Sequence, residues 1–205
     1  MAGWVQNVTR GKTIWVLEQS GEWACGMCCA GMALRWTENG NPTEDLLANA
    51  SRKTGTKGQR YEYAIQDRPD MVATPLVGLK PKVKHKDVLD DPGTTAQGVV
   101  DLLNGYKGIT AALTRGPGAK ACKDSCRATA DDGSKAVIIG LVDPPHFVIC
   151  HSHVRRVGDY TIHLIGDPGH GDVIEGHITD SGGKPYLATT AGRYGTIIDE
   201  MIVVS

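Results

Sequence analysis

Residues 17–36 read LEQSGEWACGMCCAGMALRW and combine a cluster of cysteines with the start of a helical pattern. The cluster consists of Cys25, Cys28 and Cys29. From the first cysteine to Trp36 the apolar residues recur at the spacing of one helix face, so a helix is expected over 25–36. Gln19 stands six residues before the first cysteine. The thiols therefore have three interpretations: metal ligands, buried filler, or a nucleophile with supporting groups.

The composition is that of an ordinary soluble globular protein. The 205 residues include 40% hydrophobic and 22% charged side chains, which fits a single domain over 1–205. The formal net charge is -1, so neither nucleic acid nor an anionic membrane surface is favoured as a partner. The N-terminal residues contain no apolar run after a charged start, so we expect a protein made in the cytoplasm without a signal peptide.

Six cysteines do not by themselves predict a disulfide framework in this chain. The three clustered ones share a predicted helix, where the geometry rarely allows neighbouring residues to bridge. We therefore expect reduced thiols, as in cytosolic proteins. Disulfides of Cys122, Cys126 or Cys150 with distant partners stay open at this point.

The remaining patterns predict helices first and strands later. Helices are expected over 25–36, from Thr43 onward, over 93–106 between a Thr94 or Thr95 N-cap and a stop at Gly105, and over 119–130. Strands are expected over 12–18, 108–113, 135–142, 146–154, 160–166 and 197–204, with a long loop over 53–92 that contains a strand near 71–77. The predicted fold class is therefore α+β, with a helical half over about 12–130 and an antiparallel sheet over about 135–205.

Two interpretations of the cysteines need no catalysis. Buried cysteine packs as a small apolar side chain, which is the favoured interpretation of Cys28 and Cys29. The CGMC motif is also a CxxC, but zinc needs two further ligands. Neither the pair Cys122 and Cys126 nor the CHSH motif at 150–153 has a standard zinc spacing. We expect no metal and no other cofactor, and a zinc or plain binding module stays as the non-enzymatic alternative.

The catalytic interpretation explains more of the pattern. The N-terminus of a helix stabilises a thiolate through its amide N–H groups and its dipole, and Cys25 stands at such a start. Gly26 would let a substrate backbone approach closely. Gln19 comes off the end of the preceding strand, so its amide and the backbone N–H of Cys25 together predict an oxyanion hole.

These residues resemble the papain-like cysteine proteases. A glutamine, five residues and then Cys-Gly at the head of a small-residue helix most resemble the bacteriocin-processing peptidases of ABC exporters and related bacterial effector proteases. Papain itself reads Cys-Gly-Ser-Cys-Trp with the second cysteine active, which would nominate Cys28. The glutamine spacing selects Cys25 instead. The resemblance runs from about Trp15 to the end of the chain and implies a papain-like fold, with the nucleophile helix packed on the sheet. The chain departs from the family at Cys28 and Cys29 in the nucleophile helix, at the 53–92 loop and in the tail after residue 167.

The resemblance also implies a histidine and then an acid further along the chain. PPHFVICHS and YTIHLIGDPGHG match these places and nominate His146 as the base and Asp167 as the group that orients it. Hairpin geometry supports the pairing. If the turn centres near 157–158, Asp167 faces Val148 and shares a face with His146, as a diagonal neighbour about 7–8 Å away. His151 then lies on the other face, although a one-residue shift of the turn would reverse this parity.

The implied function is a cysteine endopeptidase with the triad Cys25, His146 and Asp167, and with Gln19 in the oxyanion hole. The implied biological role is that of a bacterial effector or toxin, delivered into a target cell by a dedicated secretion system. Its expected partners are a protein or peptide substrate and a neutralising immunity or inhibitor protein. The same triad would also serve an amidase, deamidase, isopeptidase or acyltransferase, because a fold does not determine a reaction.

Overall fold

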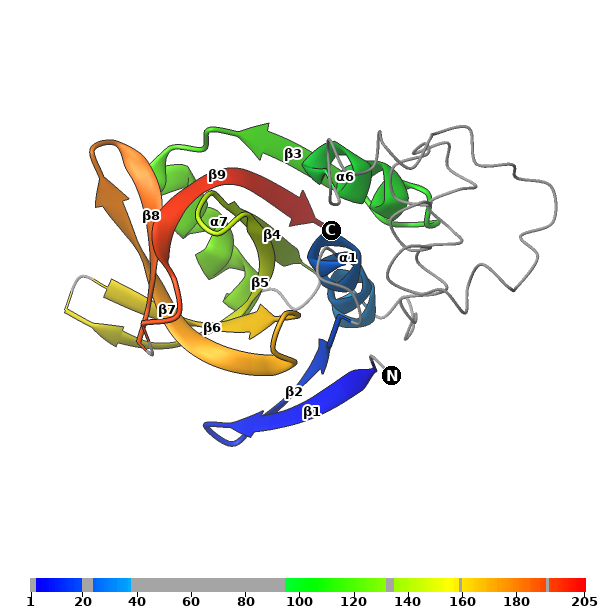
Figure 1. Cartoon of the computed structure of the whole chain (residues 1–205), viewed down its shortest axis with the longest axis horizontal. Helices are drawn as coiled ribbons and strands as arrows, with labels where there is room; N and C mark the ends of the chain where they lie inside the picture. The colour runs from blue at the N-terminus through cyan, green and yellow to red at the C-terminus, as the bar shows by residue number, and fades with distance from the viewer. Residues whose placement is uncertain (1–2, 20–23, 38–94, 132–134, 159, 191) are drawn as a thin grey trace, which may run out of the picture.

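Short runs of alternating apolar residues, separated by turn residues, build most of the molecule. The computed structural model describes residues 3–19, 24–37, 95–131, 135–158, 160–190 and 192–205. Within these residues the strands are β1 (Trp4–Thr9), β2 (Lys12–Leu17), β3 (Ala111–Arg115), β4 (Ala136–Leu141), β5 (His146–Val157), β6 (Tyr160–Asp167), β7 (Asp172–Ser181), β8 (Lys184–Thr189) and β9 (Gly195–Val204). The helices are α1 (Cys25–Trp36), α6 (Ala96–Asn104) and α7 (Ala119–Asp131), as Figure 1 shows.

Six antiparallel strands close into a barrel. They follow the order β9-β4-β5-β6-β7-β8, and β8 pairs again with β9 to complete the ring. The closing ladder sets Tyr186 opposite Ile197 and Ala188 opposite Gly195. Strand β3 adds to the free side of β9, whereas β1 and β2 form a separate hairpin beside the barrel (Figure 1). Closure removes the unpaired edges that an open sheet of these strands would present.

The predicted α+β, papain-like fold is therefore wrong. The described chain is mostly β, with three short helices around a closed barrel in place of a helical half packed on an open sheet. The region before residue 131 already contains β1, β2 and β3. Strands β7 and β8, which the sequence analysis left in an undefined tail, carry the chain around the ring and return it to β9. This return is a long-range pairing that local patterns do not encode.

The barrel packs on two cores, one inside it and one outside. The inner core takes buried side chains from every strand of the ring, and α7 adds Cys122 and Cys126 to it. Residues of α1, α6 and β2 cover the outer wall, where they meet Phe147 and Ile149 of β5. Alternation along β5 therefore sends odd-numbered residues at its start toward α1 and the even-numbered Val148 into the barrel. The cysteine-bearing helix thus lies against the outside of the barrel wall.

Most of the locally predicted elements occur in the structure, with shifted ends. The helix over 25–36 has the predicted bounds. Helix α6 has the predicted ends, since the Thr95 side chain caps it and Gly105 ends it. The helix expected from Thr43 and the strand near 71–77 lie outside the described residues. None of the described helices is long and apolar enough to cross a membrane.

Candidate active site

The first turn of α1 presents Cys25 at the edge of the outer core. Ala24 is the N-cap and offers no side-chain cap, and the helix begins with the bond from Cys28 N to Ala24 O at 2.9 Å. The side chain of Cys25 is 8% exposed, whereas Cys28 and Cys29 are 0% exposed. Only the first cysteine of the cluster therefore reaches the surface at the helix N-terminus, and the other two pack as small apolar groups.

The hairpin of β5 and β6 brings His146 and Asp167 to the same end of the barrel. His146 is the first residue of β5 and Asp167 is the last residue of β6. Near this end Ile149 pairs with Gly166, and one further step would set Val148 opposite Asp167. Because side chains alternate, His146 and Asp167 share a face at the rim.

Two irregularities in β5 produce this register. The ladder starts one residue later than predicted, with Val157 opposite Tyr160, and it shifts between Cys150 and Ser152 and again beyond His153. Each shift places one extra residue in β5, as in a β-bulge. Without them Asp167 would lie opposite Cys150, four residues along the strand from His146. At about 3.3 Å per residue, the bulges shorten this offset from about 13 Å to about 7 Å.

The two side chains meet directly. His146 Nε2 lies 3.0 Å from Asp167 Oδ1, and the two side chains are 11% and 0% exposed. Burial by itself would lower the pKa of His146, but hydrogen bonds with Asp167 and Cys25, and their charges, raise it to about 9. Since Nε2 faces the carboxylate, Nδ1 is the ring nitrogen left to interact with the Cys25 thiol. The proton therefore stays on His146 at neutral pH.

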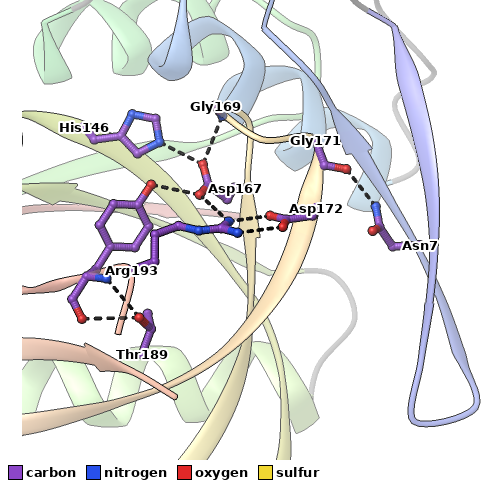
Figure 2. A network of polar contacts seen from close by, with 9 residues as sticks. Asn7, His146, Asp167, Gly169, Gly171, Asp172, Thr189 and Arg193 are labelled. Carbon is purple, nitrogen blue, oxygen red and sulfur yellow. Dashed lines mark hydrogen bonds and ion pairs between the residues drawn. The ribbon is translucent and has the colours of Figure 1, made fainter. Parts of the chain in front are cut away.

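Asp167 is the centre of a polar network, which Figure 2 shows. Its Oδ1 also accepts from the backbone N of Gly169 at 2.9 Å, and its Oδ2 accepts from Arg193 Nη1 at 3.0 Å and from Tyr194 OH at 2.8 Å. Burial by itself would raise the pKa of the Asp167 carboxyl, but the hydrogen bonds from His146, Tyr194 and Arg193, together with the charge of His146, lower it to about 2. The carboxylate is thus ionised although it is fully buried.

Gln19 and Gly169 lie close to this network. The backbone N of Gln19 donates to Pro168 O at 2.9 Å, so the residue that leaves β2 adjoins the turn after Asp167. A Cβ placed on Gly169 would lie 3.3 Å from both Asp167 Oδ1 and His146 Cε1. Glycine therefore allows this turn to close over the histidine–carboxylate pair.

The structure thus brings Cys25, His146 and Asp167 together and sets Gln19 beside them, while His151 lies elsewhere. The ring of His151 packs against Trp36 at the other end of α1, with centroids 3.7 Å apart and planes tilted by 33°. Burial and the charge of Lys12 lower the pKa of His151 to about 4.

The remaining cysteines gather inside the barrel. Cys150 Sγ lies 3.9 Å from the carbonyl oxygen of Cys126, and Cys122 belongs to the same core. None of the six cysteines of the chain is joined in a disulfide in this structure. Among the described residues no three or more His, Cys, Asp or Glu side chains are arranged to hold a metal ion.

Sequence reasoning missed the three residues that contact Asp167 besides His146: Gly169, Arg193 and Tyr194. The last two lie in the connection between β8 and β9, about 26 residues beyond Asp167, and only barrel closure brings them back. The signal for that closure was present but weak, because DVIEGHITDS and KPYLAT alternate on either side of the turn residues GG. Nothing in the pattern TTAGRYG indicates a contact with Asp167.

Comparisons of the chain with protein-family models, with curated proteins and with solved structures found no match.

Proposed function

We propose that the protein is a thiol hydrolase of the cysteine endopeptidase type, with Cys25 as nucleophile. The observation that carries the proposal is the pairing of a buried, ionised Asp167 with His146 at 3.0 Å, next to a thiol at a helix N-terminus. A nucleophile, a base and a group that orients the base are the three parts that this chemistry requires. The proposal rests on these side chains and needs no particular fold.

In the proposed cycle His146 holds the proton during attack, because the neighbouring Asp167 carboxylate stabilises the imidazolium. The pKa of His146 is raised to about 9, and Cys25 is the first residue of α1, a position where helix N–H groups and the helix dipole favour negative charge. The thiolate attacks the peptide carbonyl carbon, and His146 gives its proton to the leaving amine as the C–N bond breaks. Neutral His146 then takes a proton from water, which hydrolyses the thioester and restores both groups.

Asp167 keeps one orientation of the imidazole throughout this cycle. Its Oδ1 accepts from Nε2, which leaves Nδ1 for exchange of the proton with sulfur and amine. The backbone N–H of Cys25 and the amide of Gln19 are the proposed donors to the oxyanion. The bond from Gln19 N to Pro168 O holds that residue at the correct end of the barrel for this role.

The experiment that tests the proposal exposes a proteome to the full-length protein and to Cys25→Ala and maps newly formed N-termini. New N-termini that depend on Cys25 support endopeptidase activity. If none form, an acyl-enzyme trap with peptide, amide and ester probes decides whether the same triad performs amidase or acyl-transfer chemistry. A chain in which Cys25 forms no adduct with any probe contradicts thiol hydrolysis altogether.

The biological setting stays a prediction from the resemblance. Delivery into a target cell and an immunity partner are features of the effector proteases that the Gln-x5-Cys-Gly pattern resembles. A binding partner that covers the rim around His146 would protect Cys25 from alkylation. Such protection by a co-expressed neighbouring gene product is the measurement that would support this role.

A further inference from the structure

Every lone-pair direction of the Asp167 carboxylate is used. Oδ1 takes His146 and the backbone of Gly169, and Oδ2 takes Arg193 and Tyr194. A carboxylate has about four acceptor positions, so the group is saturated. The contacts divide cleanly, because one oxygen faces the histidine and its turn, and the other faces two side chains from the β8–β9 connection (Figure 2).

Arg193 and Tyr194, the two residues that donate to Oδ2, are each fixed by a further partner. Arg193 forms a fork on Asp172, with Nη1 at 2.6 Å from Oδ1 and Nη2 at 2.8 Å from Oδ2. Three hydrogen bonds join the backbone of Tyr194 to Thr189: Tyr194 N donates to Thr189 Oγ1 at 2.9 Å, and Tyr194 O accepts from Thr189 N at 3.0 Å and from Thr189 Oγ1 at 3.3 Å. A planar fork between two carboxylates leaves the guanidinium little freedom. The connection is thus anchored at both residues that reach Asp167.

Tyr194 also contacts the base itself. Its ring stacks with the imidazole of His146, with centroids 5.8 Å apart and planes inclined by 24°. The hydroxyl of the same residue donates to the carboxylate that holds that imidazole. One side chain therefore constrains both partners of the histidine–carboxylate pair.

A fully buried carboxylate without donors would be costly and would tend to be protonated. Loss of the Oδ2 donors would leave Asp167 held only through Oδ1, by His146 and Gly169, and would favour protonation of the buried carboxyl. The donors on Oδ2 therefore contribute to the orientation of the base through Asp167.

We propose that Arg193 and Tyr194 are positioning residues that hold Asp167 ionised and aligned on His146. The inference rests on the proposed function for its role in turnover. It makes the site dependent on closure of the barrel, because the β8–β9 connection has to return to the rim before the histidine is oriented. We call the contacts of Arg193 and Tyr194 with Asp167 the clamp. It acts on Asp167 directly and on Cys25 only through His146.

The kinetic test compares full-length Tyr194→Phe and Arg193→Lys with the parent. We expect Tyr194→Phe to lose about tenfold in kcat or more at an unchanged KM, since a hydrogen bond to a charged group has an effect of this size. Arg193→Lys keeps the charge but loses the fork, so we expect a loss in the same direction. Tyr160→Phe, at a side chain that is 51% exposed, and Arg115→Lys, in a surface pair with Glu200, are the matched controls with parental kinetics.

A second readout separates positioning from scaffolding and needs no turnover. The titration of the His146 imidazole is followed by NMR in full-length Cys25→Ala chains with and without Tyr194→Phe or Arg193→Lys. We expect each added change to move the titration to lower pH, because a less firmly held carboxylate stabilises the imidazolium less. The His146 resonance is assigned by its absence in His146→Asn.

The outcomes separate the two proposals. Unchanged titration overturns the positioning role, whether kcat is parental or reduced, since a reduced rate alone would then reflect scaffolding. A shifted titration supports the clamp. If the parent cleaves no substrate while the titration still moves, the clamp stands and the proposed function fails. Should Tyr194→Phe not fold, the more exposed Arg193→Lys decides the question by the same titration.

Discussion

Two histidines of β5 lie near opposite ends of α1, and their pKa values shift in opposite directions. His146 lies close to Cys25 at the start of the helix, and its pKa rises to about 9. His151 packs against Trp36 at the end of the helix, and its pKa falls to about 4. Burial lowers the pKa at both positions, so burial does not decide the sign.

The difference comes from the partners. His146 faces the ionised carboxylate of Asp167, whereas the buried Nδ1 of His151 has no hydrogen-bond partner within the described part of the chain. The charge that acts on His151 is the cation of Lys12. A buried imidazole beside an anion holds a proton and is suited to acid–base chemistry. A buried imidazole among aromatic and cationic groups is neutral and contributes only packing.

The strongest way to break this comparison is to remove the reactive groups. We expect Cys25→Ala and His146→Ala each to lose about 10⁴- to 10⁶-fold in hydrolysis while the fold persists, because either change removes a member of the triad. His151→Ala should retain activity within about twofold, since it touches none of these groups. Peptidase assays with circular dichroism as the folding control measure both effects. An active Cys25→Ala with an inactive Cys28→Ala would assign the nucleophile to the second cysteine.

Replacement of Asp167 removes the carboxylate that His146 faces, so the pKa of His146 should fall toward that of His151. Asp167→Ala leaves four donors without their acceptor, and we expect activity to fall by about 10²- to 10⁴-fold and stability by about 3 kcal/mol. Asp167→Asn should cost less activity than loss of Cys25, because its amide oxygen still accepts from one side. It should nevertheless be destabilised, since its NH₂ group faces donors. Kinetics and urea unfolding test this order, and a fully active Asp167→Ala would contradict it.

The two histidines should also give opposite dependences of stability on pH. The pKa of folded His146 is raised from 6.5 to about 9, so its contribution is fully present below pH 6.5 and is lost as the pH rises through 9. The full contribution is about 3 kcal/mol. The pKa of folded His151 is depressed to about 4, so its contribution is present above 6.5 and is lost as the pH falls toward 4. The free energy of unfolding, measured in urea from pH 4 to 9.5, should fall less at alkaline pH in His146→Ala and less at acid pH in His151→Ala than in the parent. The opposite result, a weaker acid dependence in His146→Ala and a weaker alkaline dependence in His151→Ala, would contradict the comparison.

The smallest expected effect concerns the two cysteines behind the nucleophile. Cys28 and Cys29 are fully buried in the outer core, and burial together with neighbouring thiols and Asp167 holds the pKa of Cys29 well above its usual range. We expect Cys28→Ala and Cys29→Ala to retain hydrolysis and to cost about 1 kcal/mol of stability each. Chemical denaturation alongside the peptidase assay measures both quantities. A loss of activity comparable to that of Cys25→Ala would contradict a packing role.

The hairpin prediction shows where local reasoning succeeds and why. The face shared by His146 and Asp167 was predicted with the turn placed one residue too early. The predicted face was nevertheless correct, because the later turn shifts the register in one direction and the two bulges of β5 shift it back. Together they leave Val148 as the position opposite Asp167. Neither bulge has a signal in HFVICHSHVRRV, since these residues suit a regular strand equally well.

The sequence by itself determined the elements and the chemistry-bearing residues that local spacing controls. Helical periodicity and the first cysteine place the start of α1, and β-rich runs between turn residues place β4, β5, β6 and β9 close to their observed bounds. Only the tertiary structure decided that these strands form a barrel, because the β8–β9 pairing joins segments by long-range hydrogen bonds. The same closure brings Arg193 and Tyr194 onto Asp167. Such contacts depend on the path of the chain through space, and no local pattern of residues encodes that path.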